Sequence, residues 1–279
     1  MSRIILLCIL SFGYTNQINN ISRNIEQFSL MNGNSFINNI VNDIDTNLYS
    51  ISFIQYPGQV SSGQLLYFEK YKQYFIQSKI STINYGILRD NENEFSASDY
   101  MIEIAIIKQH SNNFMIGSSV GYAKSHIANY TASQLIQDIG LSYSYLNELV
   151  IIGFSIENMT HIINEYSNIN SQYTHYNNLS FQLNPQYINA SLFINYIASS
   201  INHSELIMSV RGSINNQFHI FAGKSLYLSD HSMNDTYRFY DNISLGIGIK
   251  IPKYKFNFGI QYLGDIGVVL GSSLSVYTK

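Results

Sequence analysis

Charged residues are scarce in this chain of 279 residues. Asp, Glu, Lys and Arg make up 12% of it, whereas 46% of the residues are hydrophobic. The charged share is about half of that in ordinary soluble proteins. The formal net charge is −3, and Lys and Arg form no cluster, so we predict that nucleic acid is not a partner. So few charges suggest that much of the surface faces something other than water.

Cysteine is nearly absent, tryptophan does not occur, and there are only three prolines. The one cysteine, Cys8, lies in residues 1–13 (MSRIILLCILSFG), where Arg3 precedes a short apolar run. This arrangement is typical of a secretory signal peptide, and the run is too short to span a bilayer. We expect cleavage after Gly13. The mature chain would then have no thiol, and hence no disulfide and no cysteine-bound metal.

Long apolar runs and metal-binding motifs are missing as well. No later stretch approaches 18 consecutive apolar residues, which argues against a helical membrane protein. The sequence has no His-x-x-x-His pair. His110 and His231 have Ser, Asn or Asp nearby, but neighbours in sequence do not make a triad. Asp230, Asp235 and Asp241 do not have EF-hand spacing. We therefore predict a protein that is not an enzyme and holds neither cofactor nor metal.

Alternation is the dominant pattern that is present. From Ile243 to Ile251 every second residue is aliphatic, and Ser244, Gly246 and Gly248 lie between them. A strand points alternate side chains to opposite faces, so one face here is apolar and the other small or polar. The pattern recurs in fourteen segments that we predict to be strands: 48–56, 62–69, 73–88, 97–109, 114–126, 137–146, 149–157, 179–183, 186–198, 204–211, 217–227, 239–250, 254–263 and 267–278.

Two architectures fit such strands, a soluble sandwich and a membrane barrel. A sandwich usually covers its outer faces with Lys, Glu and Thr, whereas Gly, Ser and Asn dominate the second face here. Tyr and Phe near the strand ends, as at Tyr143 and Tyr254, suit the aromatic girdles of a barrel. In hydrocarbon a sheet must close so that every backbone group is paired. We therefore predict an all-β fold, a closed antiparallel transmembrane β-barrel of about 14 strands over residues 48–279, in contact with the lipid of the bacterial outer membrane.

The links between the predicted strands alternate between short and long. Outer-membrane barrels have short periplasmic turns and longer external loops. We therefore expect the four longest links, 89–96, 127–136, 158–178 and 228–238, to be external. Loops on a rigid scaffold often carry function, so we predict that 158–178 and 228–238 form a partner surface.

The segment 14–47 precedes the first predicted strand. We expect it to be either a plug inside the barrel or a periplasmic tail. Glu103, Glu205, Arg211 and Lys250 fall on the polar face of their strands, so we expect them to point into the barrel. There they would either pair with charges of a plug or face water.

Several segments resemble the PorV/PorQ family of outer-membrane barrels, which is related in fold to FadL-type fatty acid transporters. They are residues 87–100, with Phe95-Ser-Ala-Ser-Asp99-Tyr100, and residues 116–130, 138–143, 152–158 and 246–258. Chain length and the Phe95–Tyr100 motif are more similar to the PorQ branch. The resemblance implies a non-enzymatic component of the type IX protein secretion system, with surface-exposed or periplasmic secretion proteins as partners. The fold relation implies an alternative, a FadL-like channel for hydrophobic small molecules.

Overall fold

The computed structural model describes residues 47–90, 93–166, 175–200, 204–227 and 242–278. The predicted signal peptide and the segment 14–47, except for Asn47, lie outside these residues. The described residues contain no helix that is long and apolar enough to cross a bilayer. They form two short 3-10 turns, η2 (Pro57–Gln59) and η3 (Gly264–Ile266), and fourteen strands: β1 (Asn47–Gln55), β2 (Ser61–Tyr71), β3 (Tyr74–Asp90), β4 (Asn93–Ser111), β5 (Phe114–Ile127), β6 (Tyr130–Tyr145), β7 (Val150–Asn164), β8 (Tyr176–Leu183), β9 (Ala190–Ser199), β10 (Ser204–Ser213), β11 (Phe218–Tyr227), β12 (Ile243–Ile251), β13 (Tyr254–Tyr262) and β14 (Val268–Thr278).

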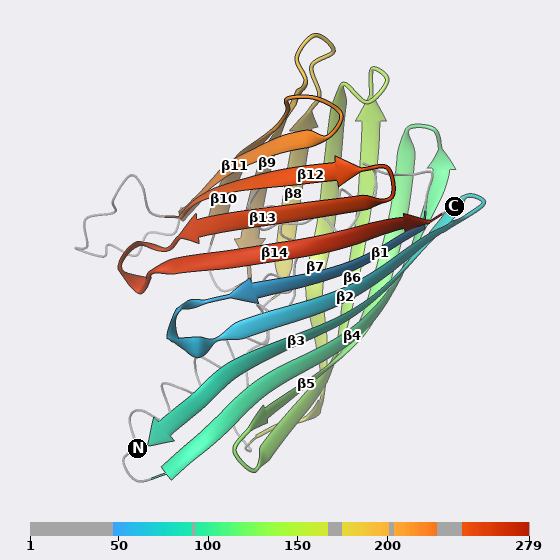
Figure 1. Ribbon diagram of the computed structural model, residues 1–279. Helices are drawn as coiled ribbons and strands as arrows, with labels where there is room; N and C mark the ends of the chain where they lie inside the picture. The colour runs from blue at the N-terminus through green and yellow to red at the C-terminus, as the bar shows by residue number, and fades with distance from the viewer. Residues whose placement is uncertain (1–46, 91–92, 167–174, 201–203, 228–241, 279) are drawn as a thin grey trace.

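The strands form one closed antiparallel barrel (Figure 1). Each strand pairs with its neighbours in the chain, and β1 closes the ring by pairing with β14, from Asn47 opposite Thr278 to Gln55 opposite Leu270. Closure gives the sheet hydrogen-bonding partners on both sides of every strand, which a membrane-spanning sheet requires. The predicted fold is therefore confirmed.

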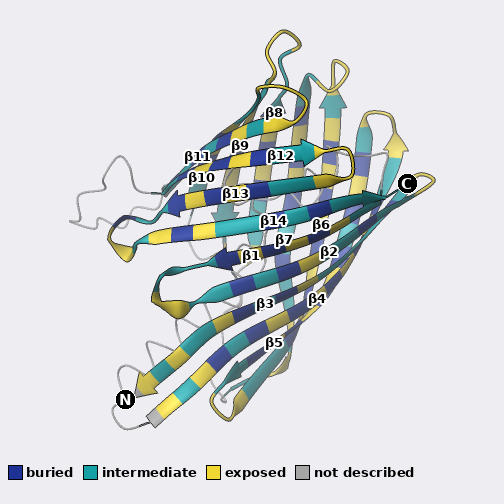
Figure 2. Ribbon diagram, viewed as in Figure 1, coloured by how far each residue is buried: buried dark blue, intermediate teal, exposed yellow. Residues whose placement is uncertain are grey.

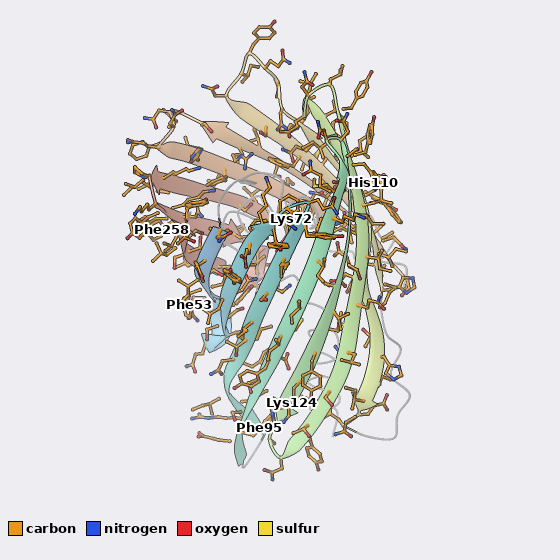
Figure 3. All side chains as sticks on the ribbon, turned by 90° about the vertical axis from the view of Figure 1, so that its right-hand side faces the viewer. Phe53, Lys72, Phe95, His110, Lys124 and Phe258 are labelled. Atoms are coloured by element: carbon orange, nitrogen blue, oxygen red, sulfur yellow. The ribbon has the colours of Figure 1, made fainter. Side chains whose placement is uncertain are left out.

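The apolar face of the strands points outward. On β4, Tyr100, Ile102, Ile104 and Ile106 have exposed fractions of 50–56%, whereas the residues between them are buried. The same alternation colours most strands in Figure 2, and Phe53 and Phe258, labelled in Figure 3, are likewise about half exposed. A row of large apolar side chains around a closed sheet is favourable in contact with hydrocarbon and unfavourable in contact with water. The outer face is therefore the lipid-contacting face.

Small residues on the interior face allow side chains of neighbouring strands to meet. A Cβ atom on Gly248 of β12 would lie 2.7 Å from Asn257 Oδ1 and 3.1 Å from Phe221 Cε2. Phe221 on β11 and Asn257 on β13 therefore come together over β12 because position 248 has no side chain. This explains why position 248, on the inward face of β12, is occupied by glycine.

The barrel wall is uneven in height. Strands β3 to β7 have 17, 19, 14, 16 and 15 residues, whereas the other strands have 8–11. We call the end of the barrel that holds Asn47 and Thr278 the near end and the opposite end the far end. Figure 3 shows Lys72 and His110 at the near end, and Phe95 and Lys124 where the long strands project at the far end. We call this part, strands β3 to β7, the tall wall.

The tall wall corrects the predicted loops. The links predicted at 89–96 and 127–136 are wrong, because β3 and β4 are separated by two residues and so are β5 and β6. The link predicted at 158–178 is shorter than expected, since β7 continues to Asn164 and β8 begins at Tyr176. In the β3–β4 and β5–β6 hairpins, polar residues mark the part of the strands that contacts water and not the end of strand pairing. The backbone hydrogen bonds of both hairpins continue beyond the membrane. The link predicted at 228–238 lies outside the described residues.

Two of the long links still orient the barrel. Residues 165–175 and 228–242, the two longest links between strands, both join strands at the far end, whereas near-end links such as 72–73, 112–113 and 252–253 have two residues. Short turns mark the periplasmic side of outer-membrane barrels. We therefore assign the near end to the periplasm and the far end to the outside.

Candidate functional site

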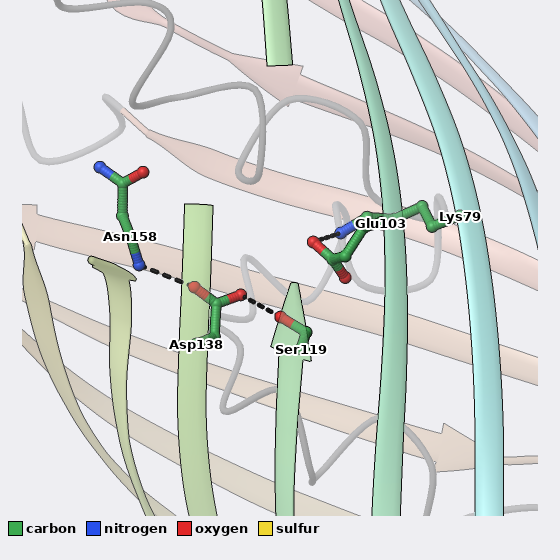
Figure 4. Close-up of polar contacts among 5 residues, drawn as sticks. All are labelled: Lys79, Glu103, Ser119, Asp138 and Asn158. Atoms are coloured by element: carbon green, nitrogen blue, oxygen red, sulfur yellow. Dashed lines mark hydrogen bonds and ion pairs between the residues drawn. The ribbon is translucent and has the colours of Figure 1, made fainter. Parts of the chain in front are cut away.

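The interior face of the tall wall carries the best-defined group of polar contacts in the described residues (Figure 4). Five strands contribute one residue each: Lys79 from β3, Glu103 from β4, Ser119 from β5, Asp138 from β6 and Asn158 from β7. We call these five residues the polar belt. Alternate residues of each strand point inward, and the strand register pairs Lys79 with Glu103 and Ser119 with Asp138.

An ion pair forms the first half of the polar belt. Lys79 and Glu103 are direct partners in the β3–β4 ladder, and Lys79 Nζ lies 2.9 Å from Glu103 Oε2. Their side chains are 12% and 3% exposed, so both charges are removed from bulk water. The desolvation of each charge is offset by its partner, and neither can be lost without leaving the other uncompensated.

A β-bulge forms the second half. The pairing of β6 with β7 shifts register between Gln137 and Ile139, and Asn158 has a positive φ of 63°. Asn tolerates this left-handed conformation better than most residues. The bulge removes the Asn158 N–H from the ladder, and this group donates instead to Asp138 Oδ1 at 2.7 Å. Ser119 Oγ donates to the other carboxylate oxygen at 3.0 Å, so Asp138 fixes the bulge from inside the barrel.

A third buried carboxylate lies closer to the far end. Asp99 is 1% exposed and accepts hydrogen bonds from Tyr85 Oη, at 2.5 Å, and from Ser125 Oγ. These donors come from the two strands that flank β4. The interior of the tall wall therefore holds four carboxylates, Asp99, Glu103, Asp138 and Glu157. Glu103 pairs with the ammonium group of Lys79, and the other three accept hydrogen bonds from uncharged donors.

Apolar clusters lie on the same interior face, on both sides of the polar belt. Toward the near end, Phe68, Phe75, Ile107, Met115 and Ile151 pack together with Ala105. Toward the far end, a second cluster combines Ile83, Met101, Ala123 and Ile136. A third cluster, the pair of Phe193 and Phe221, lies toward the near end on the opposite side of the ring. The interior is thus not a uniform polar surface but alternates between apolar and polar zones.

The four charged residues predicted to point inward do so. Glu103 belongs to the polar belt, and Glu205 accepts a hydrogen bond from the buried Ser225. The Arg211 guanidinium lies 5.5 Å from the ring centre of the buried Phe193, and Lys250 Nζ lies 5.2 Å from that of Tyr277. For Glu103 the wall itself supplies the opposite charge through Lys79, so it needs no plug for pairing. The predicted plug lies outside the described residues.

The residues weighed as catalytic or metal-binding form no site in the described part of the chain. His110 is exposed near the turn that joins β4 to β5, with its ring edge-on to Phe114. No group of three His, Cys, Asp or Glu side chains among the described residues could hold a metal ion. His231, Asp230, Asp235 and Asp241 lie outside these residues. The absence of catalysis, cofactor and metal stays a prediction.

Sequence reasoning gave Lys79, Ser119 and Asp138 no role in a site. Lys79 and Asp138 do share the interior parity of their strands, and this signal could have marked them. Asn158 was noted only as the end of a segment that resembles a family motif. Its role depends on the bulge, and a register shift leaves no pattern in a single strand.

No protein-family model and no curated protein matches the chain. Solved structures do match it. The Pseudomonas putida toluene transporter TodX has a TM-score of 0.60 at 10% identity, with 84% of this chain and 90% of that chain covered. CymD, a monoaromatic hydrocarbon channel, has a TM-score of 0.63 at 9% identity, with 84% and 88% covered.

Likeness at this identity shows a shared fold, that of FadL-like outer-membrane barrels. Together with the apolar outer face, it places the chain in the bacterial outer membrane, as predicted. The matched structures are a transporter and a channel, not enzymes, which agrees with the expectation of a non-enzymatic protein. None of the matches points to the PorV/PorQ family, so that resemblance stays a prediction.

Proposed function

We propose that the barrel is a FadL-like channel through which hydrophobic small molecules cross the outer membrane. The observation that carries this proposal is the pair of apolar clusters on the interior face of β2 to β7. The fold likeness to a toluene transporter and a monoaromatic hydrocarbon channel supports it.

Apolar clusters inside a barrel have a direct physical use. A small hydrophobic molecule that leaves water for such a surface gains about 1.5–3 kcal/mol, by analogy with the burial of a Leu or Phe side chain. Binding of this strength favours entry yet allows release, and transport requires both. The lipopolysaccharide-covered outer leaflet hinders such molecules, so a protein route increases their uptake.

Uptake of radiolabelled toluene by intact cells tests the proposal. We expect cells that express the barrel to take up toluene faster than cells that lack it. Gly121→Leu, which adds a side chain on the interior face of β5, should lower this rate severalfold. A Cβ atom at this position would make ordinary van der Waals contacts, with no atom closer than 3.4 Å. Val120→Leu, on the adjacent lipid-facing position, is the matched control and should leave uptake unchanged.

The second candidate is the role implied by the PorV/PorQ resemblance, assembly of type IX secretion proteins at the cell surface. The tall wall favours this role, because it presents a sheet beyond the level of the shorter strands. A folded barrel that gives no toluene uptake, but retains surface proteins on affinity capture from its own host, would favour the secretion role over the channel.

A further inference from the structure

One row of interior residues crosses the tall wall between the polar belt and the far end. The register places Ser81 of β3 opposite Met101 of β4, Met101 opposite Ala123 of β5, and Ala123 opposite Gln134 of β6. All four residues are buried on the interior face. The row therefore has polar ends and an apolar middle.

The polar ends of the row have no hydrogen-bond partner among the described residues. Within this part of the chain Ser81 Oγ and Gln134 Nε2 make no hydrogen bond, and neither does Ser62 Oγ on β2, one row further toward the far end. Their residues are 0%, 8% and 2% exposed. Buried polar groups normally find a partner, and an unpaired one is costly, so these groups are suited to pair with something that enters the barrel.

The middle of the row belongs to the far apolar cluster. Met101 and Ala123 contact Ile83 and Ile136, and Tyr85 packs against the same cluster. An apolar ring or chain bound here would have the Ser81 hydroxyl at one edge and the Gln134 amide at the other. The site thus combines apolar contact with a small number of hydrogen-bonding groups, as ligand sites in proteins usually do.

The charged residues around the row determine which ligand charge is favoured. Asp99 and Glu103 flank Met101 on β4 and both point inward. Within the described parts of β3 to β6, Lys79 is the one interior cation, and it is paired with Glu103. A carboxylate ligand would therefore meet net negative charge at close range, which disfavours it.

We propose that the row from Ser81 to Gln134 is a subsite for the uncharged hydrogen-bonding group of an otherwise apolar permeant. This inference rests on the proposed channel function and narrows its substrate class. A hydroxyl, carbonyl or amide oxygen can accept from Ser81 Oγ at one edge of the row or from Gln134 Nε2 at the other, and Ser81 can also accept in return. Uncharged alcohols, phenols and amides fit the subsite better than hydrocarbons do, and carboxylates fit it worst.

Three ring compounds of similar size test the subsite in the uptake assay: benzyl alcohol, toluene and benzoate. We expect the barrel to transport benzyl alcohol faster than toluene at equal low concentration, and benzoate slowest. The double variant Ser81→Ala with Gln134→Met should lower the ratio of benzyl alcohol to toluene uptake about fivefold, the usual effect of a lost hydrogen bond. Toluene uptake itself should not change.

Two control variants keep the test specific. Ser209→Ala removes another buried hydroxyl, on β10 across the barrel, that has no hydrogen-bond partner in the described part of the chain, and it should leave the ratio unchanged. Ser81→Thr keeps the hydroxyl and should largely retain the ratio, which separates loss of the group from misfolding.

An unchanged ratio in the double variant, or an equal drop in Ser209→Ala, would overturn the subsite and mean that these groups bind only water. Benzoate uptake as fast as that of benzyl alcohol would also overturn it, whereas no uptake of any ring by the folded barrel would overturn the channel function itself.

Discussion

Replacing Lys79 by methionine should lower the free energy of unfolding by about 3–5 kcal/mol, the usual cost of removing one partner of a buried ion pair. Methionine keeps most of the volume of the lysine stem but supplies no charge. Glu103, which is 3% exposed, would then remain as a buried carboxylate without its ammonium partner at 2.9 Å. The measurement is urea-induced unfolding of the barrel in lipid vesicles, followed by the loss of heat-modifiable mobility on gels.

The double variant Lys79→Met with Glu103→Leu is the matched control for this prediction. It removes both charges and should recover most of the lost stability, since an apolar pair of similar volume is often as stable as a buried ion pair. If the single and double variants are equally unstable, the loss comes from packing in the wall, and the ion pair does not have the role given to it here.

Replacing Ile104 by arginine should destabilise the barrel by about 2–4 kcal/mol, as a charge does near the midplane of the lipid face. Ile104 is 55% exposed on the outer face of β4, between Ile102 and Ile106. The guanidinium would have to reach the headgroups along the strand or draw water into the hydrocarbon. The same vesicle unfolding assay measures the effect.

Ser96→Arg provides the control on the same strand and the same face. Ser96 is exposed in the projecting part of β4, beyond Tyr100. An arginine there meets water or headgroups, so stability should change little. Equal losses at positions 96 and 104 would show that the two positions share one environment, which the membrane assignment of β4 forbids.

Alternation made the barrel predictable from the sequence. In the segment from Ile243 to Ile251 the aliphatic residues share one face of β12, and the structure turns Leu245 and Ile247 outward. The interior polarity of Ser244 and Gly248 followed from the same period of two. A membrane sheet cannot leave an edge unpaired, so the alternation implied closure as well as strands.

Strand ends were less predictable, because the polarity of a side chain depends on whether it contacts water and not on whether its backbone is paired in the sheet. Residues 89–96 were predicted to be a loop because they are rich in charged and polar residues, yet Arg89 pairs with Glu94 in the β3–β4 hairpin. A strand that leaves the membrane loses its apolar partners but keeps its backbone hydrogen bonds. Strands β3 to β7 therefore continue as paired strands beyond the membrane and form the tall wall.

The polar belt could be predicted only in part. The inward direction of Glu103 follows from its parity on β4, and the structure confirms it. Its partner Lys79 lies 24 residues earlier, and only the register of the β3–β4 hairpin brings the two opposite each other. The contact between Asp138 and the Asn158 N–H depends on a bulge, which changes the register locally and cannot be read from either strand alone.

The central claim is that alternate residues of each strand face lipid, and single tryptophans test it most directly because the chain has none of its own. Tryptophan should be placed at Ile80, which is 52% exposed on the outer face of β3, or at Gln77, which faces inward on the same strand. In vesicles of lipids with brominated acyl chains, we expect strong fluorescence quenching at position 80 and little at position 77. Equal quenching at both positions, or stronger quenching at position 77, would contradict a closed barrel with its apolar face in the membrane.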